Sequence, residues 1–192
     1  MTPKAAPISR RTALRLAASI AAVSAFAPLA QATKPKPVPR TLGPITRRVV
    51  PYPTAHPPGT IEISNANRLL HFVHGNGRAA EYDISVGRDG FLWTGTTIIG
   101  RKAKWPDWRP PAEMRARQPD LPAHVPPGPY NPLGARAIYL YASGRDTLYR
   151  IHGTNNAATV GGFETSGCFR MSNADVLELY EQVRAGAKVI VT

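Results

Sequence analysis

A cysteine and a histidine lie in two short blocks whose residue types suit acyl transfer. Residues 152–155 read HGTN and residues 166–171 read SGCFRM. The thiolate is the reactive form of cysteine, and a neutral imidazole beside a thiol can take its proton. Cys168 is the only cysteine of the chain, so it forms no intramolecular disulfide. The alternative to a nucleophile is a buried, inert thiol, because free cysteines are among the most buried residues.

Glycines adjoin both reactive residues. Gly167 allows backbone amides to approach a substrate closely, so the N–H groups of Gly167 and Cys168 are candidates for an oxyanion hole. Gly153 follows His152 at the end of a predicted strand, a position from which an imidazole can face a pocket. Because strand side chains alternate, we expect His152 on the face opposite the apolar Ile151.

The elements that must position these blocks are mostly short strands, and the predicted fold class is mainly β. Segments rich in Val, Ile, Leu and Tyr are bounded by turn residues, which is typical of strands. The GNG sequence at 75–77 predicts a β-hairpin. One helix is predicted over residues 173–185, with Ser172 or Asn173 as N-cap and Gly186 in the left-handed conformation after it. The predicted strands are 60–64, 68–74, 78–86, 135–142, 147–152 and 187–192.

Proline marks a long insertion within this β pattern. Nine of the 20 prolines lie in residues 106–132, with Trp105 at the start and Tyr130 near the end. Proline is excluded from helix interiors and central strands, so the regular structure is expected on either side of this stretch. Long, stiff insertions are often lids or binding loops. We expect a lid that contacts substrate through Trp105 and Tyr130, and the alternative is a packed surface loop.

The first 58 residues predict a leader and a linker. Arg10 and Arg11 precede an alanine-rich, uncharged run, so residues 1–32 are predicted to be a cleaved signal peptide of the twin-arginine type. An uncleaved membrane anchor is the alternative, although the 18-residue run from 16 to 33 is mostly alanine and contains proline, so it would span poorly. Residues 33–58 are proline-rich and basic and are predicted to be an extended linker. Residues 59–192 then form the folded domain.

The net charge of +12 does not by itself indicate a nucleic-acid partner. Nine basic residues and no acidic residue lie in residues 1–48, so most of the excess belongs to the leader and linker. Export and contact with an anionic surface explain such a region better than a nucleic-acid groove. We expect no nucleic-acid partner and no stable membrane span after signal cleavage. We also expect no metal and no cofactor, because ligand spacing with an acidic or cysteine partner is lacking at His56, His71, His74 and His124.

Residues 151–155 (IHGTN) and 166–171 (SGCFRM) resemble the signature of the L,D-transpeptidases, bacterial enzymes with a YkuD-type catalytic domain. The likeness includes segments 105–108 (WPDW) and 131–136 (NPLGAR) and covers roughly residues 60–192. It implies a β-sandwich-like L,D-transpeptidase catalytic domain, with one helix near the carboxyl end and a lid insertion rich in proline and tryptophan.

The resemblance also implies roles for individual residues. Cys168 is the implied nucleophile and His152 the implied general base, oriented by the backbone carbonyl of Gly153. Many members carry a histidine where this chain has Ser166, which leaves the backbone amides at Ser166 and Gly167 as the groups that orient the substrate or stabilise an oxyanion. The remaining candidate is Arg170, two residues after the cysteine. It would bind a substrate carboxylate or serve as a structural hydrogen-bond donor.

The implied reaction is acyl transfer on the stem peptides of peptidoglycan, in the periplasm or cell envelope. The thiolate would attack the bond between the third residue, diaminopimelate, and the terminal D-alanine of a tetrapeptide, and D-alanine would leave. An amine would then resolve the acyl-enzyme: a second stem, giving a 3→3 cross-link, or a lysine of an envelope protein. Water as acceptor would make the chain a carboxypeptidase. A wall-binding module that holds stem peptides without chemistry is the remaining alternative.

Overall fold

The computed structural model describes residues 42–192. The predicted signal peptide and the first part of the predicted linker, residues 33–41, lie outside the described residues. In the part that is described, no helix has the length and apolar character needed to cross a membrane. The elements in chain order are β1 (Arg48–Pro51), β2 (Ile61–Ser64), β3 (Leu69–Gly75), β4 (Arg78–Asp83), β5 (Val86–Gly87), β6 (Gly95–Lys104), α1 (Ala112–Arg117), β7 (Arg136–Ala142), β8 (Arg145–His152), the 3-10 helix η1 (Ala157–Thr159), β9 (Phe163–Thr165), β10 (Phe169–Arg170), α2 (Asn173–Gln182) and β11 (Lys188–Val191).

Nine strands form one sheet in the order β1-β4-β3-β2-β11-β6-β7-β8-β10, and β5 pairs with β9 beside it. Every predicted strand is present. The predicted hairpin joins β3 to β4, where Asn76 and Gly77 have φ angles of 52° and 67°. Positive φ at both turn residues suits the tight turns that join twisted strands, and Asn-Gly favours it. β8 and β10 are parallel neighbours, which brings the two reactive blocks together.

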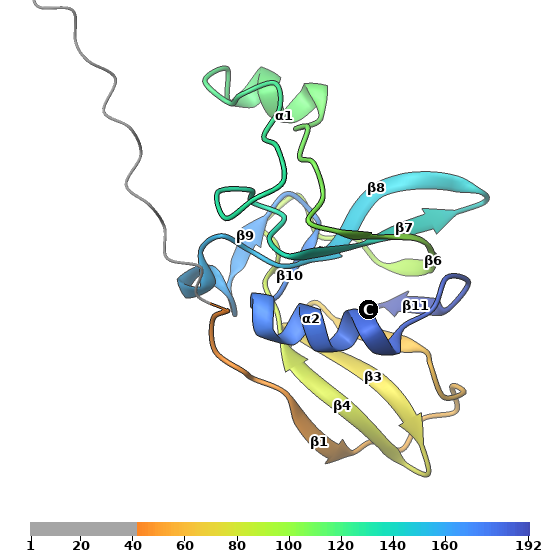
Figure 1. The fold of residues 1–192 in the computed structure, drawn as a ribbon. Helices are drawn as coiled ribbons and strands as arrows, with labels where there is room; N and C mark the ends of the chain where they lie inside the picture. Colours follow the sequence, from red (N-terminus) through yellow and green to blue (C-terminus); the bar gives the residue numbers. More distant parts are fainter. Residues whose placement is uncertain (1–41) are drawn as a thin grey trace, which may run out of the picture. The chain divides into compact units, whose positions relative to one another are not determined.

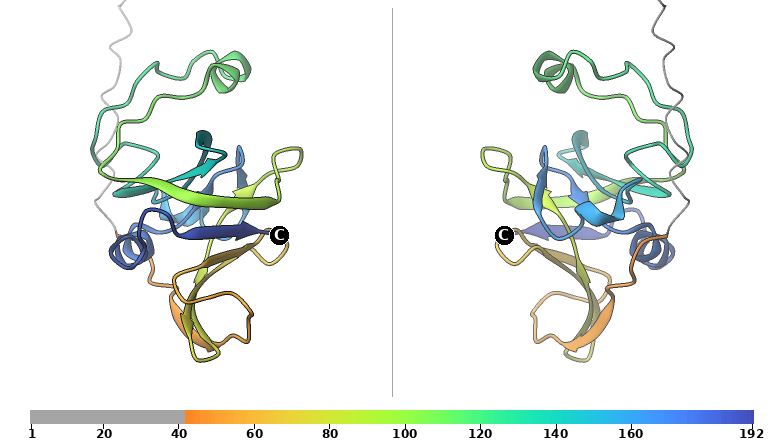
Figure 2. Two further views of the ribbon diagram at one scale, coloured as in Figure 1. Left: turned by 90° about the vertical axis from the view of Figure 1, so that its right-hand side faces the viewer. Right: turned by 90° about the vertical axis from the view of Figure 1, so that its left-hand side faces the viewer.

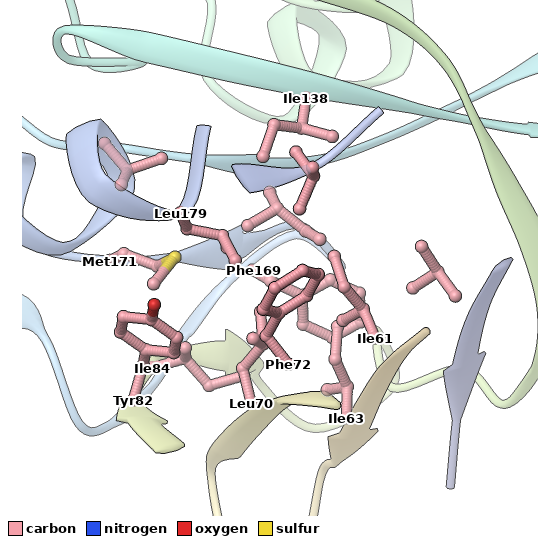
Figure 3. Packing of buried hydrophobic residues seen from close by; sticks show 14 of the residues in the cluster. Ile61, Ile63, Leu70, Phe72, Tyr82, Ile84, Ile138, Phe169, Met171 and Leu179 are labelled. Atoms are coloured by element: carbon pink, nitrogen blue, oxygen red, sulfur yellow. The ribbon is translucent and has the colours of Figure 1, made fainter. Parts of the chain in front are cut away.

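The sheet bends so that its two halves enclose a common core. Ile61 and Leu70 of the first half belong to the same buried cluster as Ile138 and Ile151 of the second. Figure 3 shows side chains from β2, β3 and β4 meeting Ile138 and Phe169, with Leu179 of α2 beside them. Burial of this apolar surface is the main stabilising term. The expected fold class, mainly β and sandwich-like with one longer helix, is confirmed.

The helix α2 begins where predicted and ends three residues early. The Ser172 hydroxyl accepts a hydrogen bond from the Asp175 amide at 3.0 Å and so caps the first turn. Val183 has an extended conformation and lies in the core, so tertiary packing ends the helix before residue 185. The ammonium of Lys102 donates to the carbonyls of Tyr180 and Val183 at this end. In Figure 1, α2 lies between the β6–β8 part of the sheet and the β1–β4 part.

Four strands were missing from the prediction: β1, β6 and the short strands β9 and β10. Residues 48–51 were expected within an extended linker, but β1 pairs with β4 as the edge strand, where proline is tolerated because one side of an edge strand needs no backbone donors. The hydroxyl of Thr46 also donates to the buried carboxylate of Asp175 at 2.8 Å. The linker prediction is therefore wrong for this segment. β6 escaped notice because a bulge between Ile99 and Arg101 interrupts its alternation of buried and exposed residues.

The insertion between β6 and β7 projects from the sheet, with α1 at its far end (Figures 1 and 2). Its two arms pair where Trp108 and Val125 exchange backbone hydrogen bonds of 3.0 and 2.8 Å. The side chain of Asn131 is fully buried at its base and donates to the carbonyls of Pro106 and Val125. The insertion contains the short helix α1, although we expected no helix there.

Candidate active site

The register of β8 against β10 places the reactive residues on one face of the sheet. Phe169 lies opposite Ile151, and both side chains are fully buried in the core. Arg170 lies opposite His152 in the same ladder, so these two side chains occupy the other face. Cys168 precedes Phe169 and shares that face. The prediction that His152 and Ile151 point to opposite sides is confirmed, and the side of His152 and Cys168 lines a cleft of about 950 Å³.

His152 is held as a neutral imidazole. Its Nδ1 lies 2.6 Å from the carbonyl oxygen of Gly153, and a carbonyl can only accept, so Nδ1 carries the proton and Nε2 has a free lone pair. Burial and, next in size, the charge of Arg170 lower the pKa of His152 to about 4, although the hydrogen bond to Gly153 acts in the opposite direction. At neutral pH the ring can therefore accept a proton at Nε2.

Cys168 is held as a thiol in the resting protein. Burial raises its pKa, and the backbone amide and guanidinium of Arg150 together with the charge of Arg170 offset part of this effect. Its Sγ lies 3.7 Å from the carbonyl oxygen of Leu148. The cleft therefore holds a neutral thiol and a neutral base rather than a preformed thiolate–imidazolium pair. Proton transfer from sulfur must then accompany attack.

The backbone around Gly167 is shaped by close packing. Its φ is +104°, and a Cβ at this position would lie 2.5 Å from the ring of Tyr149, so only glycine fits. Its carbonyl accepts a hydrogen bond from the indole of Trp93 at 2.8 Å. Its amide donates to the hydroxyl of Thr165 at 3.1 Å, which removes it from the expected oxyanion hole. The amide of Cys168 has no acceptor among residues 42–192 and is the remaining donor for a developing oxyanion.

Two further predicted site residues, Ser166 and Arg170, lie in the cleft. The Ser166 hydroxyl accepts from the Arg88 guanidinium at 3.2 Å, and Nη1 of Arg170 donates to Thr159 at 2.8 Å. The Nε of Arg170 is buried and has no partner among the described residues. Arg170 therefore combines a structural hydrogen bond with a second donor left unused.

The insertion contributes Trp105 to the cleft but not Tyr130. Trp105 lies at the start of the insertion with a φ of +43°, and its exposed side chain lines the cleft. Tyr130 is exposed and is absent from the lining, and its carbonyl accepts from the Asn155 side chain at 3.0 Å. The chain at Tyr130 turns toward the loop after β8, so this side chain lies outside the cleft, and its contact with substrate stays a prediction.

Asn173 positions the loop that follows His152, and sequence analysis identified it only as a possible helix cap. Its Oδ1 accepts from the amides of Ala135 and Thr154 at 2.9 and 3.2 Å, and its Nδ2 donates to the Thr154 carbonyl at 2.7 Å. A Cβ at Gly134 or Gly153 would lie only 2.3 or 2.2 Å from Oδ1. Glycine at 134 and 153 and asparagine at 173 are all visible in the sequence. Their shared role could not be predicted, because these residues come into contact only in the folded structure.

These features define a cysteine–histidine site on a mainly β scaffold. Comparison with known proteins gives the family. The YkuD model, described as the L,D-transpeptidase catalytic domain, matches residues 58–191, and the chain belongs to this family.

The curated relatives agree with this assignment. The chain is 37% identical over 139 residues to the probable L,D-transpeptidase YbiS of Escherichia coli K12, a match that covers 68% of this chain and 43% of the relative. It is 37% identical over 129 residues to the probable L,D-transpeptidase YcfS of the same strain, covering 64% and 40%. The chain thus spans less than half the length of these relatives.

Solved structures show the same fold. The L,D-transpeptidase of Enterococcus faecium matches with a TM-score of 0.54 and 17% identity, covering 71% of this chain and 50% of that one. A Brucella melitensis protein named as a probable carnitine operon oxidoreductase matches with a TM-score of 0.53 and 39% identity, covering 77% and 94%.

Proposed function

We propose that this chain is an exported peptidoglycan L,D-transpeptidase with Cys168 as nucleophile and His152 as general base. Membership of the L,D-transpeptidase family supports the reaction class. One observation carries the assignment of residues: the contact of His152 Nδ1 with the Gly153 carbonyl at 2.6 Å leaves Nε2 unprotonated on the sheet face that also bears Cys168. A base and a nucleophile are then available in one cleft without any further group.

The acylation step follows from these positions. Nε2 of His152 accepts the thiol proton while Sγ of Cys168 forms a bond to the carbonyl carbon of the third stem residue. The carbonyl oxygen becomes an oxyanion, which the free amide of Cys168 stabilises. When the intermediate collapses, the bond to the D-alanine nitrogen breaks, and the imidazolium returns its proton to that nitrogen. The products are free D-alanine and a thioester on Cys168.

Deacylation uses the same groups in reverse. Neutral His152 takes a proton from the attacking amine of an acceptor as the amine nitrogen bonds to the thioester carbon. The carbon–sulfur bond then breaks, and the imidazolium returns its proton to sulfur, which regenerates the thiol. A second stem peptide gives a 3→3 cross-link, and a lysine of an envelope protein gives a covalent anchor. Water would give a tripeptide instead, and the chain would act as a carboxypeptidase. Action in the periplasm or envelope completes the proposal, in line with the predicted leader.

Trapping of the acyl-enzyme tests this assignment. We expect intact-protein mass spectrometry to detect the mass of a bound tripeptide acyl group on the chain soon after tetrapeptide is added, together with free D-alanine. Cys168→Ala should show neither product. A tripeptide adduct on the Cys168→Ala protein would contradict the assignment. Binding of tetrapeptide without adduct or D-alanine release from the unaltered chain would favour the wall-binding module.

Alkylation of the thiol is a weaker test than acylation by substrate. A binding module needs no thiolate, so its cysteine is expected to alkylate slowly at neutral pH. Because burial raises the pKa of Cys168, slow alkylation at neutral pH is expected for a catalytic thiol as well.

A further inference from the structure

The floor of the cleft contains a row of neighbouring residues that leads away from the nucleophile, three on adjacent strands and Cys168 directly before β10. Arg101 of β6 pairs with Tyr139 of β7, and Tyr139 pairs with Arg150 of β8. The register of β10 places Cys168 next to Arg150. Paired residues lie on the same face of a sheet, and all four line the cleft.

The two arginines of this row differ in whether an acidic side chain pairs with the charge of the guanidinium group. Both guanidinium groups contact the ring of Tyr139, with Cζ at 3.4 Å from its centroid for Arg101 and 4.2 Å for Arg150. Arg150 also forms a two-pronged ion pair with Asp146, with nitrogen–oxygen distances of 2.7 and 2.9 Å. Arg101 has no acidic partner and no side-chain hydrogen bond within residues 42–192. The ring therefore holds an unpaired cation in place and leaves its N–H donors free.

The cleft around this row is also cationic. Arginine and lysine outnumber aspartate and glutamate in its lining, and one of the acidic residues, Asp107, is already engaged by His124 at 2.6 Å. A second aromatic ring, that of Phe91, is contacted by Arg88 at 4.3 Å and by Arg117 of α1 at 4.8 Å. Such a field favours an anionic ligand.

We propose that Arg101 forms an anion subsite that binds a free carboxylate of the donor peptide, on the side away from the leaving D-alanine. This inference rests on the proposed function. Adjacent strands lie about 4.8 Å apart, so Tyr139 and the guanidinium on its ring are about 10 Å from Cys168. In a stem peptide the γ-linked glutamate precedes the attacked residue, and its α-carboxylate lies within about 10 Å of the attacked carbonyl in an extended chain. Arg101 thus selects peptides with glutamate over peptides with its amide, isoglutamine, at that position.

The selectivity has a physical basis in the geometry of the pair. A guanidinium binds a carboxylate through two parallel charge-assisted hydrogen bonds, which a neutral amide cannot reproduce. We expect KM for the glutamate peptide to be about tenfold lower than for the isoglutamine peptide, a difference typical of one hydrogen bond to a charged group. The value of kcat should be similar for both, because the subsite lies away from the reacting atoms.

The test compares these two tetrapeptides with the full chain and three variants. Arg101→Gln should remove the preference by raising KM for the glutamate peptide about tenfold, with kcat and melting temperature unchanged, since Arg101 is exposed. Arg101→Lys should keep part of the preference. Arg184→Gln, which makes the same charge change at an exposed residue outside the cleft, should keep all of it. Equal use of both peptides by the unaltered chain, or equal effects of Arg101→Gln and Arg184→Gln, would overturn the subsite.

Binding without turnover separates this inference from the proposed function. Calorimetric titration of Cys168→Ala with each peptide measures the preference even where no reaction occurs. Tighter binding of the glutamate peptide, lost in Arg101→Gln/Cys168→Ala, supports the subsite whether or not the unaltered chain releases D-alanine. Equal affinities overturn it, even if the unaltered chain proves to be a transpeptidase.

Discussion

At the residue scale, the site depends on a protonation state that the fold imposes. His152 is 5% exposed and donates from Nδ1 to a carbonyl rather than to a carboxylate, so the hydrogen bond only partly offsets the cost of a buried positive charge on the ring. Arg170, its cross-strand neighbour, adds repulsion. The half-buried thiol of Cys168 is also neutral at rest. The active form is therefore a neutral pair, which both acid and base can disrupt.

The pH dependence of acylation follows from this neutral pair. Protonation of His152 stops the reaction only below a pKa of about 4, and the raised pKa of Cys168 places the upper limit above that of an ordinary thiol. We expect kcat/KM for D-alanine release to form a broad plateau from about pH 5 to about pH 8. The measurement is a pH–rate profile of the unaltered chain. An acidic limb near 6.5, the ordinary pKa of histidine, would contradict the account.

Stability should depend on pH through the same residue. The folded pKa of His152 is about 4, below that of an unfolded histidine, so between about pH 6.5 and 4 the unfolded chain binds a proton that the folded chain does not. The contribution of neutral His152 to the free energy of unfolding is therefore present at neutral pH and is lost as the pH falls through this window. Urea unfolding at pH 7 and pH 5 should show a smaller loss for His152→Gln than for the unaltered chain. An equal loss in both would argue against a buried neutral ring.

At the element scale, the start of α2 holds the loop that orients the base. The Asn173 side chain makes three hydrogen bonds to two loops, one of which directly follows Gly153. The helix thus fixes the position of the carbonyl that holds His152. The edge strand β1 and Thr46 support the same helix from the other direction, through the buried carboxylate of Asp175.

Removal of the side-chain amide of Asn173 should lower both catalytic activity and stability. Asn173→Ala leaves two backbone amides and a carbonyl without partners, which we expect to lower the free energy of unfolding by about 1–3 kcal/mol. The value of kcat should fall at least tenfold, because the Gly153 carbonyl is no longer fixed. Asn155→Ala, which loses a single exposed hydrogen bond to Tyr130, is the matched control and should change neither value much. Equal effects of the two substitutions in urea unfolding and D-alanine release would contradict a positioning role.

At the scale of the whole molecule, local patterns in the sequence predicted most of what is local in the structure. The Asn-Gly hairpin, the Ser172 cap and the opposite faces of His152 and Ile151 each depend on a few neighbouring residues. Long-range contacts were not predictable in this way. The turn of Tyr130 away from the cleft, for example, depends on how the insertion folds back. One local contact was also missed: the Gly167 amide donates to Thr165, two residues earlier, in a tight turn that the residue types alone did not specify.

The long-range organisation also explains why the missed elements matter. β6 shows little sequence alternation, yet it carries Arg101 into the cleft and Lys102 to the end of α2. β1 lies in a segment whose prolines indicated a linker, and pairing with β4 was visible only in three dimensions. The proline of β1 lies at an edge of the sheet, and the charged residues of β6 alternate between the cleft face, where Arg101 lies, and the side of α2, where Lys102 lies.

Analysis of the reaction products tests the central claim most directly. The chain and its Cys168→Ala variant are each incubated with purified disaccharide-tetrapeptide, and the products are separated and weighed by mass spectrometry. We predict dimers joined 3→3 with loss of D-alanine from the unaltered chain and unchanged substrate from the variant. Cross-linked dimers from Cys168→Ala, or unchanged substrate in both samples, would contradict the assignment of Cys168 as the nucleophile of a peptidoglycan transpeptidase.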